Sequence, residues 1–332
     1  MLMIVKSIKV LLIFLFFLNQ ALVASDTSSV RGRIICIDPG HGGTALTDHY
    51  RVGPSGEREE WINLRVGLLL RDLLEKNGAM VVMTRTSDVQ VPLADRAALA
   101  VSNKADLFVS IHHNATADST VNFPIVYFHG SASENIAGVS IGKLLVSSLR
   151  KHFYKNKTIA SLASDFTVFP TGGASVLRGS YGIPGLLAEA SFFTNAREES
   201  RLKQERHNAD EALAYFTAME EFFNHPVPEI KEKKITAALT PFKVFEEAAR
   251  MTPIAKEWRN DYNKALKLRQ SQDTAILNQA YELFTRSARS FPDSYLAGDC
   301  HRYRAELLKR LNKKDEAILE ETRAREFYIK ID

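Results

Sequence analysis

Apolar residues recur with two different periods along the first two thirds of the chain. Short apolar runs predict buried strands, whereas stretches with an apolar residue every three or four positions predict helices. The predicted strands lie at 33–38, 79–84, 106–111, 123–128 and 185–189. The predicted helices lie at 59–76, 93–103 and 133–153, and a fourth follows the last strand and ends near residue 223. This alternation predicts an α/β fold, with a mostly parallel twisted sheet, helices on both faces and functional residues at the carboxyl ends of the strands.

The last third of the chain is helical and charged, and a linker separates it from the α/β region. Pro226, Pro228 and the lysine-rich segment 231–234 indicate a linker over 225–239. This linker divides an α/β domain at 31–224 from a smaller all-α domain at 240–332. Helices of the all-α domain are predicted at about 241–269, 274–291, 295–311 and 314–329.

Part of the all-α domain fits a tetratricopeptide-like pattern. Ala280, Phe284 and Pro292 follow one another in the order that the pattern requires. The four helices amount to about two repeats, which are few for a free-standing solenoid, so we expect this domain to dock on the α/β domain. A plain helical bundle fits the same segment equally well. In either form, we expect the domain to recruit a protein partner or to localise the protein.

The first residues have the pattern of a secretory signal peptide, which we place at 1–24. Lys6 and Lys9 precede the uncharged apolar run 10–18, and the small residues Ala21 and Ala24 follow it. The run is shorter than the roughly 20 apolar residues of a membrane-spanning helix, so we expect no stable membrane span. An uncleaved signal anchor is the alternative. The pattern predicts export across the inner membrane to the periplasm or cell envelope.

Charge and cysteine content narrow the function classes. Removal of 1–24, which hold two lysines, lowers the formal net charge from +4 to +2. A balance this close to neutral argues against a nucleic-acid partner. The two cysteines, Cys36 and Cys300, fall in different predicted domains. We therefore expect neither a structural disulfide nor a cysteine-based zinc motif.

Three motifs at the ends of predicted elements carry metal-ligand side chains. The segment 38–43, Asp-Pro-Gly-His-Gly-Gly, follows the first strand and holds His41. The segment 58–64 opens the first helix with two glutamates, and the segment 110–114 ends the third strand with two histidines. Two histidines and one carboxylate make an open zinc site of the hydrolytic type, with a fourth position left for water.

Within these motifs the residues alone leave two choices open. Either Glu59 or Glu60 faces the metal, because adjacent helix positions point in different directions. Either His112 or His113 does so, because neighbours on a strand point to opposite faces. For the two glutamates, a favourable interaction with the helix dipole is a sufficient structural explanation.

Glu189 is the fourth candidate, at the end of the last predicted strand. Its neighbours on both sides are apolar. A carboxylate in such a place needs a partner or has a raised pKa. As a functional residue it would act as general base, and as a structural residue it would pair with Arg85 or Arg178.

Together these motifs resemble the zinc-dependent N-acetylmuramoyl-L-alanine amidases, the amidase-three family of peptidoglycan hydrolases, over residues 33–223. The resemblance also rests on Thr84-Arg85, Val176-Leu177-Arg178, Pro184 and Asn195. It implies that Zn²⁺ is held by three ligands and that one glutamate is catalytic. In this sequence the ligands are His41, Glu59 and His112, and the catalytic glutamate is Glu189.

The resemblance also implies the reaction. The enzyme would cut the amide bond between N-acetylmuramic acid and the L-alanine of the peptidoglycan stem peptide. Arg85, Asn114 and Arg178 are the expected substrate-binding residues, although structural ion pairing accounts for the two arginines equally well. Two alternatives stay open: a non-catalytic peptidoglycan-binding adaptor, and a zinc peptidase that cuts within the stem peptide.

Overall fold

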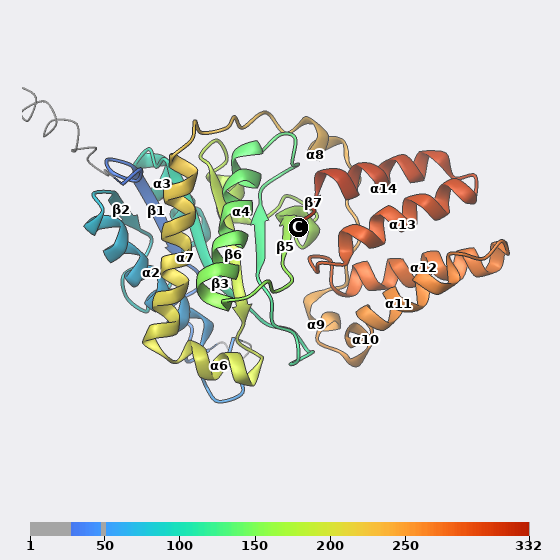
Figure 1. Cartoon of the computed structure of the whole chain (residues 1–332), viewed down its shortest axis with the longest axis horizontal. Coiled ribbons are helices and arrows are strands. Elements are labelled where there is room, and N and C mark those ends of the chain that lie inside the picture. Colours follow the sequence, from blue (N-terminus) through green and yellow to red (C-terminus); the bar gives the residue numbers. More distant parts are fainter. Residues whose placement is uncertain (1–27, 48–50, 332) are drawn as a thin grey trace, which may run out of the picture.

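The computed structural model describes residues 28–47 and 51–331, which form an α/β domain and a helical domain lying side by side (Figure 1). The predicted signal peptide lies outside the described residues. Among the helices that are described, none combines the length and the apolar character that a bilayer crossing requires. Cys36 and Cys300 are both buried free thiols, which agrees with the expected absence of a disulfide.

A seven-stranded mixed sheet forms the centre of the molecule, in the order β2-β1-β3-β6-β4-β5-β7. The first four strands in this order are mutually parallel, β4 is antiparallel to β6, β5 is parallel to β4, and β7 is antiparallel to β5. The strands are β1 (Ile34–Pro39), β2 (Met80–Met83), β3 (Leu107–Asn114), β4 (Ile125–Phe128), β5 (Ser161–Ser164), β6 (Gly185–Phe192) and β7 (Tyr328–Ile329). The mostly parallel sheet is confirmed, and β5 and β7 are strands that the sequence pattern did not reveal.

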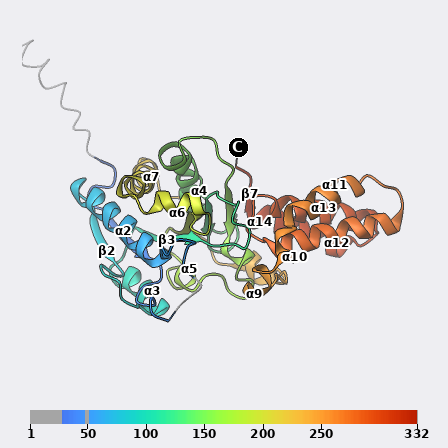
Figure 2. The same ribbon diagram turned by 90° about the horizontal axis from the view of Figure 1, so that it is seen from below.

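Helices cover both faces of this sheet, as predicted (Figure 2). One face is covered by α2 (Glu59–Lys76), α4 (Ile136–Ser148) and α7 (Glu205–Phe223), and the other by α3 (Leu93–Ser102) and α5 (Ser175–Gly179). Alternate residues of each strand therefore enter two separate cores. On β1, for example, Ile35 and Ile37 enter the first core and Cys36 the second.

The first predicted helix of the helical domain is divided into shorter helices. The single helix expected at 241–269 is wrong, because the segment forms α9 (Glu247–Arg250), α10 (Pro253–Lys256) and α11 (Trp258–Leu268). Pro253 is the physical cause: its ring disfavours helical geometry at the residue before it, so one helix ends and the next begins there. The other predicted helices are confirmed as α12 (Thr274–Ser290), α13 (Ala297–Arg310) and α14 (Lys314–Glu326).

The helical domain is built into the α/β domain, which confirms the expected docking. Strand β7, which follows α14, pairs with β5 and is the outermost strand of the sheet. Trp258 and Phe291 enter the same core as Phe123 and Phe192 of the α/β domain, with ring centroids of Phe123 and Phe291 5.9 Å apart. The two domains therefore share one hydrophobic core.

Buried polar contacts add to this junction. Asp293 of the helical domain, 3% exposed, accepts a hydrogen bond from the hydroxyl group of Tyr127 on β4. Burial, with the Asp293 carboxylate beside it, raises the pKa of Tyr127 well above its usual value, so this hydroxyl keeps its proton. The Glu326 carboxylate accepts from the hydroxyl group of Ser133 at 2.7 Å. These bonds satisfy groups that burial would otherwise leave without partners.

We expect Trp258→Ala to destabilise the whole chain, because Trp258 is only 1% exposed and lies in the shared core. The expected loss is about 3–5 kcal/mol of unfolding free energy, measured by denaturant titration as one transition of both domains. Ile254→Ala, at a position 49% exposed on the neighbouring helix, is the control and should cost less than about 0.5 kcal/mol. A separate early transition of the helical domain alone would contradict the shared core.

A buried histidine makes the helical domain sensitive to pH. The Nδ1 atom of His301 lies 2.6 Å from the Glu320 carboxylate, to which Arg304 and Arg323 also donate hydrogen bonds. Burial lowers the pKa of His301 to about 4, although the Glu320 carboxylate opposes the shift. Burial alone would raise the pKa of Glu320, but His301 and the two arginines lower it to about 2.

The free energy of unfolding should therefore decrease as the pH falls from 6.5 to about 4. Between the ordinary histidine pKa of 6.5 and about 4, the unfolded chain binds a proton at His301 that the folded chain does not bind. Proton binding to the unfolded state lowers stability as the pH falls. Across this window the melting temperature of the wild type should decrease more than that of His301→Phe. This variant keeps an aromatic ring packed against Phe242 and Tyr328 but cannot bind the proton. Parallel curves for the two proteins would contradict the assignment.

Candidate active site

The three predicted metal ligands meet at the end of the sheet where the parallel strands β1 and β3 have their carboxyl ends. His41 follows β1, Glu59 is the first residue of α2, and His112 lies near the end of β3. One carboxylate oxygen of Glu59 lies 3.1 Å from Nε2 of His41 and 3.0 Å from Nδ1 of His112. One ligand atom from each residue lies within 4.8 Å of the other two. The group that could hold a metal ion thus contains Glu59 and His112, and not Glu60 or His113.

The rejected alternatives are buried among other partners. Glu60 is fully buried and forms an ion pair with Arg58 at 2.7 Å. His113 is turned into the protein, where its ring contacts Asn63 and Glu211. The two histidines of the group remain accessible from outside, with side chains 25% and 14% exposed, whereas the Glu59 side chain is 5% exposed.

The protonation states suit a cation site. Burial lowers the pKa of His41, which favours the neutral imidazole that can act as a ligand. Burial alone would raise the pKa of Glu59, but His41 and His112 hold it well below its usual value. A carboxylate and a neutral imidazole are hard and borderline ligands of the type that zinc accepts.

His41 is held in a sparsely populated backbone conformation. Its φ angle is 59°, in the left-handed region that non-glycine residues rarely adopt. Such a conformation costs about 1–3 kcal/mol and persists only where the surroundings enforce it. Here Arg96 donates to the carbonyl oxygen of His41 at 2.7 Å, and Arg85 donates to the carbonyl oxygen of Gly40 at 2.9 Å. The two arginines therefore fix the turn that presents the imidazole.

Asp38 anchors the start of this turn. Its side chain is 1% exposed and accepts hydrogen bonds from Thr84 at 2.6 Å, Arg96 at 2.8 Å and Ser110 at 2.7 Å. These partners come from the segment after β2, from α3 and from β3. One carboxylate thus ties the elements around the site together.

Gly40 is required by the close approach of His112. The Gly40 amide donates to the carbonyl oxygen of Ile111 at 2.9 Å, which extends the β1–β3 pairing beside the site. A Cβ atom at residue 40 would lie 2.2 Å from the His112 ring, far inside van der Waals contact. Only glycine lets the ring occupy its present position.

Glu189 lies beside the three ligands on the neighbouring strand. It is the register partner of His112 in the β3–β6 pairing, and the register shifts immediately afterwards, between His112 and Asn114. Such bulges re-aim side chains next to active sites. Burial raises the pKa of Glu189 to about 8, although the charge of His112 opposes the shift. Among the described residues its buried Oε2 atom has no hydrogen-bond partner, and neither Arg85 nor Arg178 pairs with it.

The structure separates the three predicted substrate-binding residues. Asn114 ends β3 at the site edge, where its side chain accepts from the amide of Ala115 at 2.8 Å. Arg85 adjoins the turn but is 3% exposed, and its donors are directed at main-chain carbonyl groups. Arg178 is not brought to the site.

The position of Arg178 follows from strand direction. It donates to the carbonyl oxygen of Gly173, whose Cα faces Asp165 after the end of β5. Because β5 runs opposite to β1, β3 and β6, its carboxyl end lies at the end of the sheet where those three strands begin. The reversal begins at β4, which is antiparallel to β6. The sequence pattern predicted this strand but not its direction, and it did not reveal β5. The sequence also did not reveal the supporting role of Arg96, which lies in α3 and bonds to the carbonyl oxygen of His41.

His41, Glu59 and His112 form a group that could hold one metal ion, near the carboxyl ends of the parallel strands β1 and β3. A family model described as N-acetylmuramoyl-L-alanine amidase matches residues 35–221, which contain the sheet edge and all four site residues. The match covers more than half of the chain. The chain belongs to the N-acetylmuramoyl-L-alanine amidase family, as its motifs suggested.

Individual relatives agree with this assignment. YqiI, an uncharacterised protein of Bacillus subtilis, is 32% identical over 210 residues, which are 62% of this chain and 93% of YqiI. The N-acetylmuramoyl-L-alanine amidase AmiC of Escherichia coli is 28% identical over 223 residues, which are 57% of this chain and 52% of AmiC. The chain thus spans about half the length of AmiC.

Solved structures share the fold. An N-acetylmuramoyl-L-alanine amidase from Clostridium difficile 630 is 25% identical with a TM-score of 0.51, over 58% of this chain and 98% of that one. The CwlD amidase of Clostridioides difficile, solved in complex with the GerS lipoprotein, is 23% identical with a TM-score of 0.51, over 58% and 99% of the two chains. This second likeness concerns the fold alone.

We expect Gly40→Ala to disrupt the metal centre, because the added methyl group must displace the His112 ring. Affinity for a divalent transition metal should fall by at least about tenfold, measured by competition with a chromophoric chelator. Gly56→Ala is the matched control, since a Cβ atom there meets open space and only the positive φ of 89° is strained. Wild-type affinity in Gly40→Ala would show that the His112 ring does not need its present position.

Proposed function

We propose that this protein is a zinc-dependent N-acetylmuramoyl-L-alanine amidase that separates stem peptides from the glycan strands of peptidoglycan. The observation that carries the proposal is the convergence of His41, Glu59 and His112 beside Glu189, in a chain that belongs to the amidase family. The bond to be hydrolysed is the amide between the lactyl group of N-acetylmuramic acid and L-alanine.

The three ligands suit a zinc ion. Their ligand atoms converge, and the directions of the pKa shifts favour an ionised Glu59 and an uncharged His41. Burial alone would lower the pKa of His112, but the carboxylates of Glu59 and Glu189 raise it, so a bound cation would displace a proton from this ring. When bound, zinc supplies Lewis-acid activation of a water molecule and of the scissile carbonyl group. The exposed edges of the two histidines leave a path for the substrate amide.

Glu189 is proposed as the general base. Its carboxylate takes a proton from the attacking water and delivers it to the nitrogen of the leaving amine. Its position beside the ligands and its unpartnered Oε2 suit this role, because the oxygen is not engaged by an ion pair and burial strengthens the carboxylate as a base.

The remaining polar residues receive different roles. Arg85 donates to main-chain carbonyl groups, so it is proposed to fix the His41 turn and not to bind a substrate carboxylate. Asn114, at the site edge, remains a candidate for contact with the stem peptide. Arg178 is proposed as a structural residue of the loop at 172–175.

We propose that the signal peptide at 1–24 directs the chain to the cell envelope, where peptidoglycan is located. The helical domain is proposed to have a tetratricopeptide-like arrangement and to present a surface for a protein partner. Its shared core with the α/β domain would place such a partner in a fixed position relative to the catalytic groups.

Digestion of purified peptidoglycan by residues 25–332 tests the reaction. Mass spectrometry should detect intact stem peptides that begin with L-alanine, together with glycan strands that keep their lactyl groups, and a chelator should abolish both products. Cleavage inside the stem peptide would instead identify a peptidase. Stoichiometric zinc without any product would favour the non-catalytic adaptor.

Glu189→Gln should remove the proton-transfer step while leaving the metal ligands in place. Turnover should fall by about 10²–10⁴-fold, and the zinc content should remain at the wild-type level. Glu134→Gln is the control. This carboxylate is also buried, at 4% exposed, but it bonds to the linker residues Ile235 and Thr236 and to none of the proposed metal ligands. Full activity in Glu189→Gln would exclude Glu189 as the base.

A further inference from the structure

Three buried polar side chains form a continuous line from helix α7 to the metal ligand Glu59. The Nδ2 atom of Asn63 lies 3.3 Å from Oε1 of Glu59, and its Oδ1 atom lies 2.8 Å from Nδ1 of His113. On the other side of the ring, Nε2 of His113 lies 3.0 Å from Oε2 of Glu211. Asn63, His113 and Glu211 are at most 1% exposed, so this is a fully desolvated line of hydrogen bonds.

The orientation of the Asn63 amide is determined by its neighbours. Its Nδ2 atom lies within 3.3 Å of two acceptors, the carbonyl oxygen of Gly40 and the Glu59 carboxylate. The reversed amide would place its oxygen against both acceptors, which is repulsive. Asn63 therefore donates to Glu59 and accepts from Nδ1–H of His113. The ring of His113, in turn, is held at its far nitrogen by Glu211.

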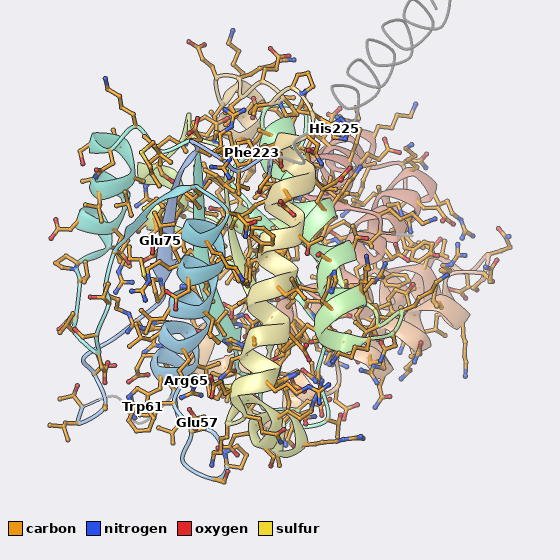
Figure 3. The ribbon with its side chains drawn as sticks, turned by 60° about the vertical axis from the view of Figure 1, so that its left-hand side comes forward. Glu57, Trp61, Arg65, Glu75, Phe223 and His225 are labelled. Carbon is orange, nitrogen blue, oxygen red and sulfur yellow. The ribbon has the colours of Figure 1, made fainter. Side chains whose placement is uncertain are left out.

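The helices that carry this line lie side by side. Figure 3 shows α2 and α7 next to one another, with Glu57, Trp61 and Arg65 near one end of α2 and Glu75 near the other. Glu59 and Asn63 lie at the end marked by Glu57 and Trp61 and face the same side of the helix, four residues apart. The line thus crosses the α2–α7 interface at the level of the metal centre.

Hydrophobic residues would fill this interface at lower cost, since burying polar groups is unfavourable unless every bond is made. The line ends on one oxygen of Glu59, the same Oε1 atom that contacts both ligand histidines. That oxygen also lies 3.3 Å from the main-chain amide of His113. Donors to a ligating carboxylate fix its rotation and thereby its direction toward the metal.

We propose that Glu211, His113 and Asn63 are positioning residues that orient the Glu59 carboxylate for metal binding. Glu211 holds the His113 ring, His113 holds the Asn63 amide, and Asn63 holds the carboxylate. This inference rests on the proposed zinc centre and assigns a function to the histidine that adjoins the ligand His112. It also makes α7, which carries no ligand, a part of the metal site.

The test compares two buried glutamate–histidine pairs on the full chain without its signal peptide. Glu211→Gln changes the pair at the end of the line, and Glu198→Gln changes the pair between Glu198 and His207, also 3.0 Å apart but without contact to a ligand. Asn63→Leu removes the donor to Glu59 directly. Each protein is titrated with zinc against a chromophoric chelator, and its melting temperature and the visible spectrum of its Co²⁺ form are recorded.

Glu211→Gln and Asn63→Leu should bind zinc about 10–100-fold more weakly than wild type and shift the Co²⁺ spectrum. Glu198→Gln should lower the melting temperature but keep the wild-type affinity and spectrum. Wild-type affinity and spectrum in both line variants would overturn the positioning role and leave the zinc centre intact. A wild-type chain that binds no zinc would overturn the metal centre itself and the positioning role with it. Glu211→Gln preserves side-chain shape, so the comparison remains decisive if Asn63→Leu does not fold.

Discussion

The buried carboxylate of Asp38 is the interaction on which the site depends. It accepts hydrogen bonds from Thr84, Arg96 and Ser110, and so joins the ends of two strands to the segment after a third and to a helix. Removing one partner of such a buried ion pair costs about 3–5 kcal/mol, because the remaining charge is uncompensated. Arg96 also donates to the carbonyl oxygen of His41, whose backbone is strained. The Asp38–Arg96 ion pair, which stabilises this end of the sheet, therefore also fixes the backbone that presents His41.

Two parts of the fold that carry no ligand contribute to the same centre. Helix α7 reaches Glu59 through Glu211, His113 and Asn63, which makes the packing of two helices part of the ligand geometry. The helical domain shares a core with the sheet face on which Leu187 lies, two residues before Glu189. The catalytic edge is thus supported from both faces of the sheet, and the last strand of the chain completes that sheet.

Much of this arrangement could be predicted from the sequence, because strong periodicity and motif spacing are local properties. The α/β fold and the docking of the helical domain followed from such patterns, whereas Glu59 was preferred to Glu60, and His112 to His113, only through the family resemblance. Strand β5, Ser-Leu-Ala-Ser, lacks the β-branched and aromatic residues typical of strands, so it was missed. The reversed direction of β4 and β5 depends on strand pairing, and the position of Arg178 away from the site was missed with it. Glu211 had no local signal, because its partner is 98 residues away in the chain. Contacts of that kind depend on packing that no short window contains.

X-ray absorption spectroscopy of residues 25–332 loaded with one equivalent of zinc tests the central claim most directly. The account predicts a four-coordinate ion with nitrogen and oxygen ligands at about 2.0–2.2 Å and the scattering of two imidazole rings. It further predicts that His112→Ala removes one of those rings from the spectrum. A site with sulfur scattering, with one imidazole in the wild type, or with no tightly bound zinc would contradict the account.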